Sequence, residues 1–118
     1  MMNRLKLVFH VNEPDKWQRV IMNINNFLND VGQGNADIEV VANGEAVSAF
    51  KSNELTNEML LEQMQKLAEI GVNFVACQNA LKAQSIAKES LPDFVTVVPA
   101  GITEIARKQT EGFAYIKP

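Results

Sequence analysis

The chain has 118 residues, of which 47% are hydrophobic and 21% are charged, and its formal net charge is -3. This length and composition predict a single folded domain over residues 1–118 and exclude a disordered or fibrous chain. The acidic balance and the scattered lysines argue against a nucleic-acid partner, because phosphates normally require a basic surface.

The single cysteine, Cys77, excludes an intramolecular disulfide and a cysteine-based zinc cluster. We expect no metal and no other cofactor. No apolar run approaches the roughly 20 residues of a membrane helix, so no membrane partner is expected. The first apolar stretch stops at His10 and is interpreted as a strand, not a signal peptide, which together with the lone cysteine predicts a cytoplasmic protein.

Strands and helices are predicted to alternate from the start of the chain. Residues 5–11 are apolar without strict alternation, as in a strand buried on both faces of a sheet. Apolar residues recur at spacings of three and four over 17–31, which predicts an amphipathic helix ending at Gly32. Residues 38–42 predict a second strand.

The middle of the chain predicts a turn at Asn43-Gly44, a short helix at 46–51, and a longer helix capped by Thr56. That helix stops at Gly71. The remaining elements are strands at 72–76, 94–98 and 113–116 and helices at 79–88 and 101–111. Helical connections between five strands imply right-handed crossovers, so we predict an α/β fold with a mainly parallel sheet.

In open parallel sheets, ligands bind beyond the carboxyl ends of the strands, which directs attention to Cys77. Cys77 ends a buried run and precedes a helix, where unpaired N–H groups favour a thiolate, the nucleophilic form of cysteine. Lys82 lies about one turn further along and would either approach the sulfur or point into water. The alternative is a buried structural thiol, the commoner fate of free cysteine.

Other loops at this edge are weaker candidates. Asn43-Gly44 would offer backbone N–H groups to an anion, and Pro99-Ala100-Gly101, with Thr103 in the following turn, would either cradle a small anion or simply start a helix. His10 lacks a plausible metal-binding partner and is interpreted as a structural histidine. The sequence contains no GxSxG, GxxxxGK[ST], GxGxxG, HExxH or CxxC motif.

Two stretches resemble the DsrE/DsrF-like family, namely ACQNALK at 76–82 and VVPAGITEIARKQTEGFAYIKP at 97–118. The similarity in layout extends from the first strand onward. It implies a three-layer α/β/α sandwich with five strands, assembled as a homotrimer or hexamer with the cysteine near a subunit interface. Asn43-Gly44-Glu45-Ala46 departs from the HGxG-like pattern expected in the second loop.

The resemblance also implies a function, since sulfur-relay members of the family carry a persulfide on a cysteine and pass it to a partner protein. By matching residues, Cys77 would be that cysteine, with neighbours Asn43, Gly44, Asn79, Lys82 and the turn from Pro99 to Gly101. The enzymatic activity expected is at most that of a sulfurtransferase-like carrier, exchanging sulfur with a donor or acceptor protein.

Two other hypotheses stay open at this stage. One is a non-enzymatic oligomeric module in which Cys77 is structural and the cleft binds a small anionic or nucleotide-like ligand. The other is a redox-sensing thiol that forms sulfenic acid or glutathione adducts. For an oligomer, the residues themselves add only that Trp17, Phe50 and several methionines exceed the needs of one small core, and that the last strand requires cover.

Overall fold

In the computed structural model, which describes residues 4–52 and 54–118, five parallel strands form one sheet in the order β4-β3-β2-β1-β5. The strands are β1 (Leu5–Val11), β2 (Ala36–Ala42), β3 (Asn73–Cys77), β4 (Val95–Val98) and β5 (Ala114–Ile116). The predicted parallel sheet is therefore confirmed. Its order places the last strand beside the first, which the sequence pattern did not specify.

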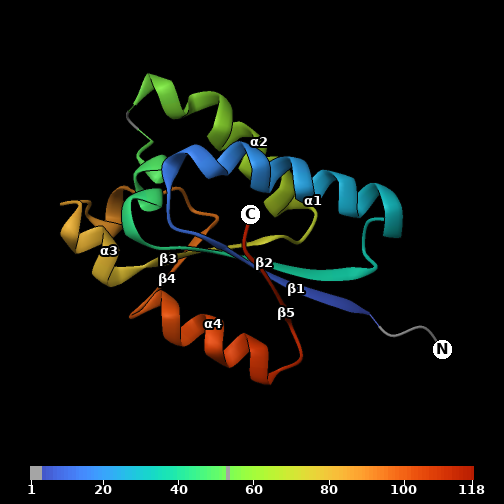
Figure 1. The fold of residues 1–118 in the computed structure, drawn as a ribbon. Coiled ribbons are helices and arrows are strands. Elements are labelled where there is room, and N and C mark those ends of the chain that lie inside the picture. Colours follow the sequence, from blue (N-terminus) through green and yellow to red (C-terminus); the bar gives the residue numbers. More distant parts are fainter. Residues whose placement is uncertain (1–3, 53) are drawn as a thin grey trace.

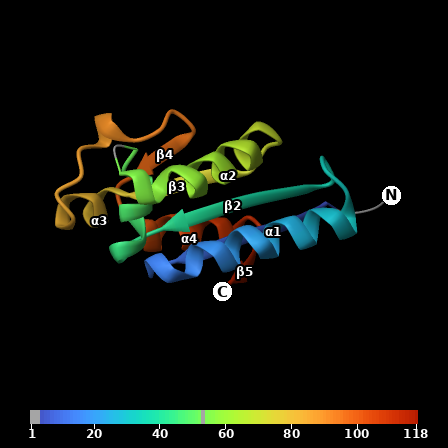
Figure 2. The ribbon, with the colours of Figure 1, turned by 90° about the horizontal axis from the view of Figure 1, so that it is seen from above.

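Helices cover both faces of the sheet. They are α1 (Trp17–Val31), α2 (Glu58–Glu69), α3 (Gln78–Ala83) and α4 (Gly101–Thr110), with short 3-10 helices η1 (Pro14–Lys16), η2 (Gly44–Phe50), η3 (Leu55–Asn57) and η4 (Lys88–Ser90). Figure 1 shows α1 and α2 on one face and α4 on the other, and Figure 2 shows α1 and α2 side by side. This arrangement is the predicted α/β/α sandwich. No helix among the described residues is long and apolar enough to cross a membrane.

The main core lies between the sheet and the α1/α2 layer. Its largest side chains are fully enclosed by the chain itself, with Trp17 1% exposed and Phe50 and Phe74 0% exposed. The Trp17 ring packs edge-on against Phe50 at 5.4 Å, and its Nε1 donates a hydrogen bond of 2.9 Å to the Ala46 carbonyl. The expectation that Trp17 and Phe50 exceed one core is therefore wrong, and they give no argument for an oligomer.

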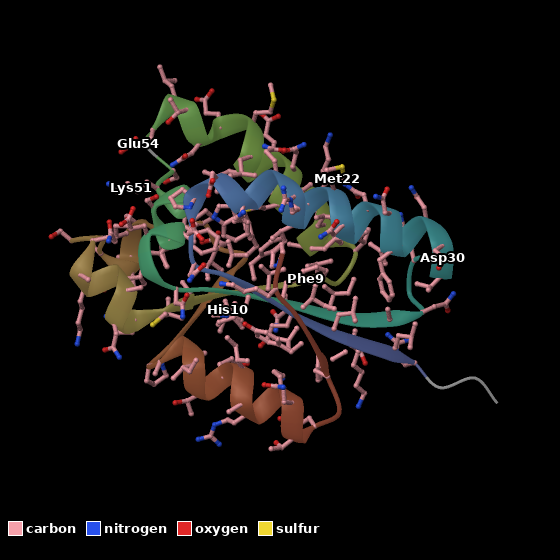
Figure 3. All side chains as sticks on the ribbon, viewed as in Figure 1. Phe9, His10, Met22, Asp30, Lys51 and Glu54 are labelled. Atoms are coloured by element: carbon pink, nitrogen blue, oxygen red, sulfur yellow. The ribbon has the colours of Figure 1, made fainter. Side chains whose placement is uncertain are left out.

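The opposite face of the sheet has a smaller core. Val8, Val41 and Val75 of the three inner strands pack against Ile105 of α4. One polar residue, Glu39, is buried on this face and is 3% exposed. Successive residues of a strand point to opposite faces, and Figure 3 shows this for β1, where Phe9 lies toward the α1/α2 layer and His10 on the α4 side.

The helix predicted at 79–88 is much shorter in the structure. α3 ends at Ala83, after which Ser85 takes a positive φ of 56°. The chain turns back there because Ile86 is drawn into the core, where it is 7% exposed and its N–H bonds the Leu81 carbonyl at 2.9 Å. Burial of one isoleucine thus overrides the helix propensity of the alanine-rich sequence.

Two smaller predictions also need correction. The short helix expected at 46–51 is the 3-10 helix η2, and Thr56 does not cap α2, because the turn Leu55–Asn57 is itself a 3-10 helix. The residue at the start of α2 is Asn57, whose side-chain amide donates instead to the carbonyls of Ser48 and Lys51, both at 3.1 Å. Asn57 thus ties the start of α2 to the end of η2.

Candidate functional site

The sheet has a topological switch point between β3 and β4. The segments that follow β1, β2 and β3 lead to the α1/α2 side, whereas α4 follows β4 on the opposite face. In such sheets a crevice opens at the carboxyl ends of the two strands whose connections diverge. Cys77 is the last residue of β3, and Pro99 follows β4 directly. The strand order therefore places Cys77 on one side of the expected ligand position and Pro99 on the other.

Cys77 joins β3 to α3. Its backbone is extended, with φ -78° and ψ 120°, and it stands at the N-cap of the helix. Its side chain is only 7% exposed and belongs to the main core cluster. The predicted position after a buried strand is correct, and the thiol is free but largely covered.

Gly101 brings the start of α4 against this thiol. A Cβ atom at Gly101 would lie 3.3 Å from Cys77 Cβ, 3.4 Å from Asn43 Cβ and 3.2 Å from Val41 Cγ1. These separations are shorter than ordinary carbon contacts, so only glycine lets the helix approach this closely. The absence of a side chain at Gly101 thus places residues from β3, the β2–η2 loop and α4 around one point.

A hydrogen-bonded chain of three side chains lies next to Asn43. His10 Nε2 is 3.0 Å from Asn43 Oδ1, and His10 Nδ1 is 2.7 Å from the Tyr115 hydroxyl. A neutral imidazole protonated at Nε2 satisfies both contacts, since it donates to the Asn43 oxygen and accepts from the Tyr115 O–H. Burial lowers the pKa of His10, the Lys117 charge acts in the same direction, and the bond to Asn43 opposes them. Both ring nitrogens of His10 are satisfied within the chain.

Gly44 fixes the loop that carries Asn43. Its φ of +56° is in the left-handed region that favours glycine, and a Cβ there would lie 3.1 Å from the Asn12 carbonyl oxygen. The Asn12 side chain in turn accepts a hydrogen bond of 2.8 Å from Lys117 Nζ, near the end of the chain. The loops after β1 and β2 are therefore held together, with the segment after β5 beside them.

The other predicted site residues are less closely associated with Cys77. Asn79 and Lys82 are exposed on α3, and the side chain of neither forms a hydrogen bond or ion pair with any residue that the structure describes. The remaining three, Pro99, Ala100 and Thr103, line a hollow of about 210 Å³ at the start of α4.

Sequence reasoning missed two groups at this edge. Arg107 shares the hollow with Thr103 and adds a positive charge one turn along α4. Tyr115 contacts His10 because β5 pairs with β1, with Val8 opposite Tyr115. The helical spacing of Thr103 and Arg107 was a usable signal, whereas the Tyr115 contact depends on the strand order. Among residues 4–52 and 54–118, no three His, Cys, Asp or Glu side chains form a cluster fit for a metal ion.

Comparisons with known proteins agree with this architecture. The DsrE/DsrF-like family matches residues 6–118. A protein of unknown function from Methanobacterium thermoautotrophicum, MTH1491, is 32% identical with a TM-score of 0.84, over 97% of this chain and 99% of that one. BT1422 from Bacteroides thetaiotaomicron, also of unknown function, shares the fold at 17% identity with a TM-score of 0.72, over 96% and 94% of the two chains. No curated protein matches the sequence.

The match covers the thiol-bearing turn, the start of α4 and the last strand, which together build the edge described above. The chain belongs to the DsrE/DsrF-like family.

Proposed function

We propose that the protein is a sulfur carrier that holds a sulfane sulfur as a persulfide on Cys77. The observation that carries this proposal is the position of Cys77, which stands at the N-cap of α3 and lies close to Gly101 at the start of α4. The N–H groups of a first helical turn have no partner inside the helix and can donate to a negatively charged sulfur. α4 has no side-chain cap at Ala100, so no side chain competes for these donors.

The chemistry requires two exchange steps of the same kind. The Cys77 thiolate attacks the outer sulfur of a donor persulfide, so that a new S–S bond forms at Cys77 and the donor leaves as a thiolate with the electron pair of the broken bond. An acceptor thiolate then attacks the terminal sulfur and releases Cys77 as its thiolate. Sulfur moves without net oxidation or reduction, and no cofactor is needed.

A lone cysteine suits such a carrier, because a second thiol within reach would release the sulfur and close a disulfide. The sequence contains no other cysteine. The acceptor must therefore be a separate molecule, and we propose a partner protein that presents its own thiol at the crevice between β3 and β4.

One observation favours a second candidate, a binding module in which Cys77 is structural. The side chain of Cys77 is only 7% exposed and belongs to the same buried cluster as Leu81 and Ala46. Buried free cysteine normally acts as a small apolar side chain. The ligand would then occupy the hollow at Thr103 and Arg107, where the Arg107 guanidinium would have to hold a small anion beside the carboxyl group of Glu104.

Intact mass spectrometry after anaerobic exposure to polysulfide separates the two candidates. A carrier gains one sulfur atom, loses it to a thiol reductant and transfers it to an acceptor thiol, whereas the Cys77→Ser variant stays unmodified. A wild-type thiol that takes up no sulfur and resists alkylation until the protein is unfolded would refute the carrier and leave the binding module.

The homo-oligomer implied by the family resemblance is part of the proposal. Both edge strands, β4 and β5, have one unpaired side within the described residues. Size-exclusion chromatography with light scattering would test it. A trimer or hexamer is the expected result, and a monomer at every concentration would contradict it.

A further inference from the structure

A groove runs along α2 on the side away from α1. Two adjoining hollows of about 500 and 370 Å³ share Gln65, Pro92 and Phe94 and so form one continuous depression. Figure 2 shows α2 between α1 and the segment that leads into β4. We call this depression, between α2 and residues 92–94, the α2–β4 groove.

The floor of the α2–β4 groove is apolar. It consists of Leu61, Ala68, Pro92 and Phe94, all half-buried. The Phe94 ring packs edge-on against the buried Phe74 at 5.7 Å, so the floor is a continuation of the main core. An apolar floor of this kind can bury side chains of a bound segment.

The charged residues on the rim of the groove are all acidic. Glu58, Glu62, Glu69 and Asp93 line it, and no Lys or Arg is among its lining residues. None of the four carboxylates forms an ion pair within residues 4–52 and 54–118. Four negative charges in one groove exceed the net charge of -3 of the whole chain. Such a concentration of one sign selects a partner of the opposite sign.

The neighbouring strand offers backbone groups as well. β4 pairs only with β3 among the described strands, and its four residues, Val95–Val98, include neither a charge nor a proline to protect the outer edge. Open edges of this kind accept an extended segment from another chain. The twelve residues of α2 give the groove a length of about 17 Å, which matches roughly five extended residues.

We propose that the α2–β4 groove docks a positively charged segment of a partner protein, with alternate apolar side chains on its floor and Lys or Arg side chains on its rim. Residues 92–94 of the groove precede the amino end of β4, whereas Cys77 pairs with Val98 at the carboxyl end of that strand. A segment bound there would therefore leave the crevice at Cys77 free. The proposal does not depend on sulfur transfer.

The test uses a soluble peptide of about ten residues in which lysine and leucine alternate, added to ¹⁵N-labelled protein at low salt. Amide shifts are expected over residues 58–69 and 92–98, and a peptide with glutamate in place of lysine should produce none. Raising the salt concentration should weaken the binding. Peptide shifts centred elsewhere, or no binding at millimolar peptide, would overturn the proposal.

Matched charge variants exclude a general attraction to an acidic protein. One variant neutralises the rim with Glu58→Gln, Glu62→Gln, Glu69→Gln and Asp93→Asn, and we expect it to bind about tenfold more weakly or worse. The other removes four exposed acids outside the groove, with Glu13→Gln, Asp15→Asn, Asp30→Asn and Glu45→Gln, and should bind within about twofold of wild type. Equal losses in both variants would overturn the proposal. Shifts at 58–69 that grow with protein concentration and no peptide would instead assign the groove to a second copy.

Discussion

The two faces of the sheet are built on different principles. The face under α1 and α2 is covered by large, fully buried side chains, among them Trp17, Phe50 and Phe74. The face under α4 has a core of three valines and Ile105, and it also buries the carboxyl group of Glu39. The first face thus has the composition of a stable core, and the second combines packing with polar groups that are costly to bury.

Because of this difference, the α1/α2 face mainly provides stability, whereas the α4 face holds groups of the candidate site. His10 and Tyr115 lie on the α4 side, and Gly101 brings the start of α4 to Cys77. A helix held by a small core can shift at a lower free-energy cost than one anchored by aromatic side chains. We therefore expect changes on the α1/α2 face to alter global stability, and changes on the α4 face to alter the site and its response to pH.

The largest effect is expected from Phe50→Ala on the α1/α2 face. Phe50 is 0% exposed and packs against Trp17, so its truncation leaves a cavity and should lower the free energy of unfolding by about 4 kcal/mol. Chemical denaturation would measure this change.

The matched truncation on the other face is Ile105→Ala, which should lower the free energy of unfolding by about 2–3 kcal/mol. Ile102→Ala, at an exposed position of α4, should lower it by less than about 0.5 kcal/mol. Ile105 is 4% exposed and Ile102 66% exposed. A loss for Ile105→Ala equal to that of Phe50→Ala would contradict the difference between the faces.

The next largest effect concerns pH and Glu39. Its Oε1 accepts a hydrogen bond from Asn73 at 3.1 Å and lies 3.9 Å from Lys108 Nζ, whereas its Oε2 has no partner among the described residues. Burial, together with the neighbouring carboxyl of Glu104, raises the pKa of Glu39 from 4.5 to about 8 against the attraction of Lys108. The folded protein therefore binds the proton more tightly than the unfolded chain does.

The contribution of Glu39 to stability is complete below pH 4.5 and is lost as the pH rises through about 8. Since one pKa unit corresponds to about 1.4 kcal/mol, we expect the free energy of unfolding to fall by a few kcal/mol across this window. Unfolding free energies measured between pH 4.5 and 9 would show it. Glu39→Gln, which keeps the shape and removes the titration, should flatten the profile, and an unchanged slope in this variant would refute the role of Glu39.

Much of the fold follows from the sequence pattern because it depends on local periodicity. The spacing over 17–31 predicts α1 with its observed end, and the apolar runs predict all five strands within two residues. The strand order is different, because it depends on where the long connection through α4 returns to the sheet. The end of α3 could not be predicted from the local pattern either, because it is determined by the burial of Ile86 and not by residues 79–83.

The candidate site divides in the same way. The proximity of Asn43, Cys77 and Gly101 follows from the rule that carboxyl ends of parallel strands share one edge. The contact between His10 and Tyr115 required the pairing of β1 with β5, so no local pattern could predict it. Glu39 did leave a signal, a charged residue inside an otherwise apolar strand.

Gly101→Ala tests how closely the α4 face is packed at the site. The added methyl group would lie 3.2–3.4 Å from atoms of Val41, Cys77 and Asn43, two of them β-carbons that move only with the backbone. The start of α4 must shift, and we expect the free energy of unfolding to fall by about 1 kcal/mol. Overpacking outweighs the stabilisation that comes from a less flexible unfolded chain when a glycine is removed. Native alkylation of Cys77 should become faster than in the control Thr103→Ala, and an unchanged alkylation rate would contradict this packing.

The smallest effect is expected at His10, the only histidine in the chain, whose ring protons can therefore be followed alone by NMR. Its pKa should lie below 6.5, mainly because of burial, and the nearby Lys117 charge lowers it further. Lys117→Gln removes that charge and should raise the pKa of His10 by a few tenths of a unit at low salt, with the difference shrinking as salt is added. The exposed Lys82→Gln is the matched control and should leave the pKa unchanged, and equal shifts in the two lysine variants would refute the assignment to Lys117.

Because the folded pKa is depressed, His10 adds to stability above pH 6.5 and this contribution is lost as the pH falls through the folded value. This slope is opposite in sign to that of Glu39. Both groups lie on the α4 face, which is therefore the pH-sensitive side of the sheet.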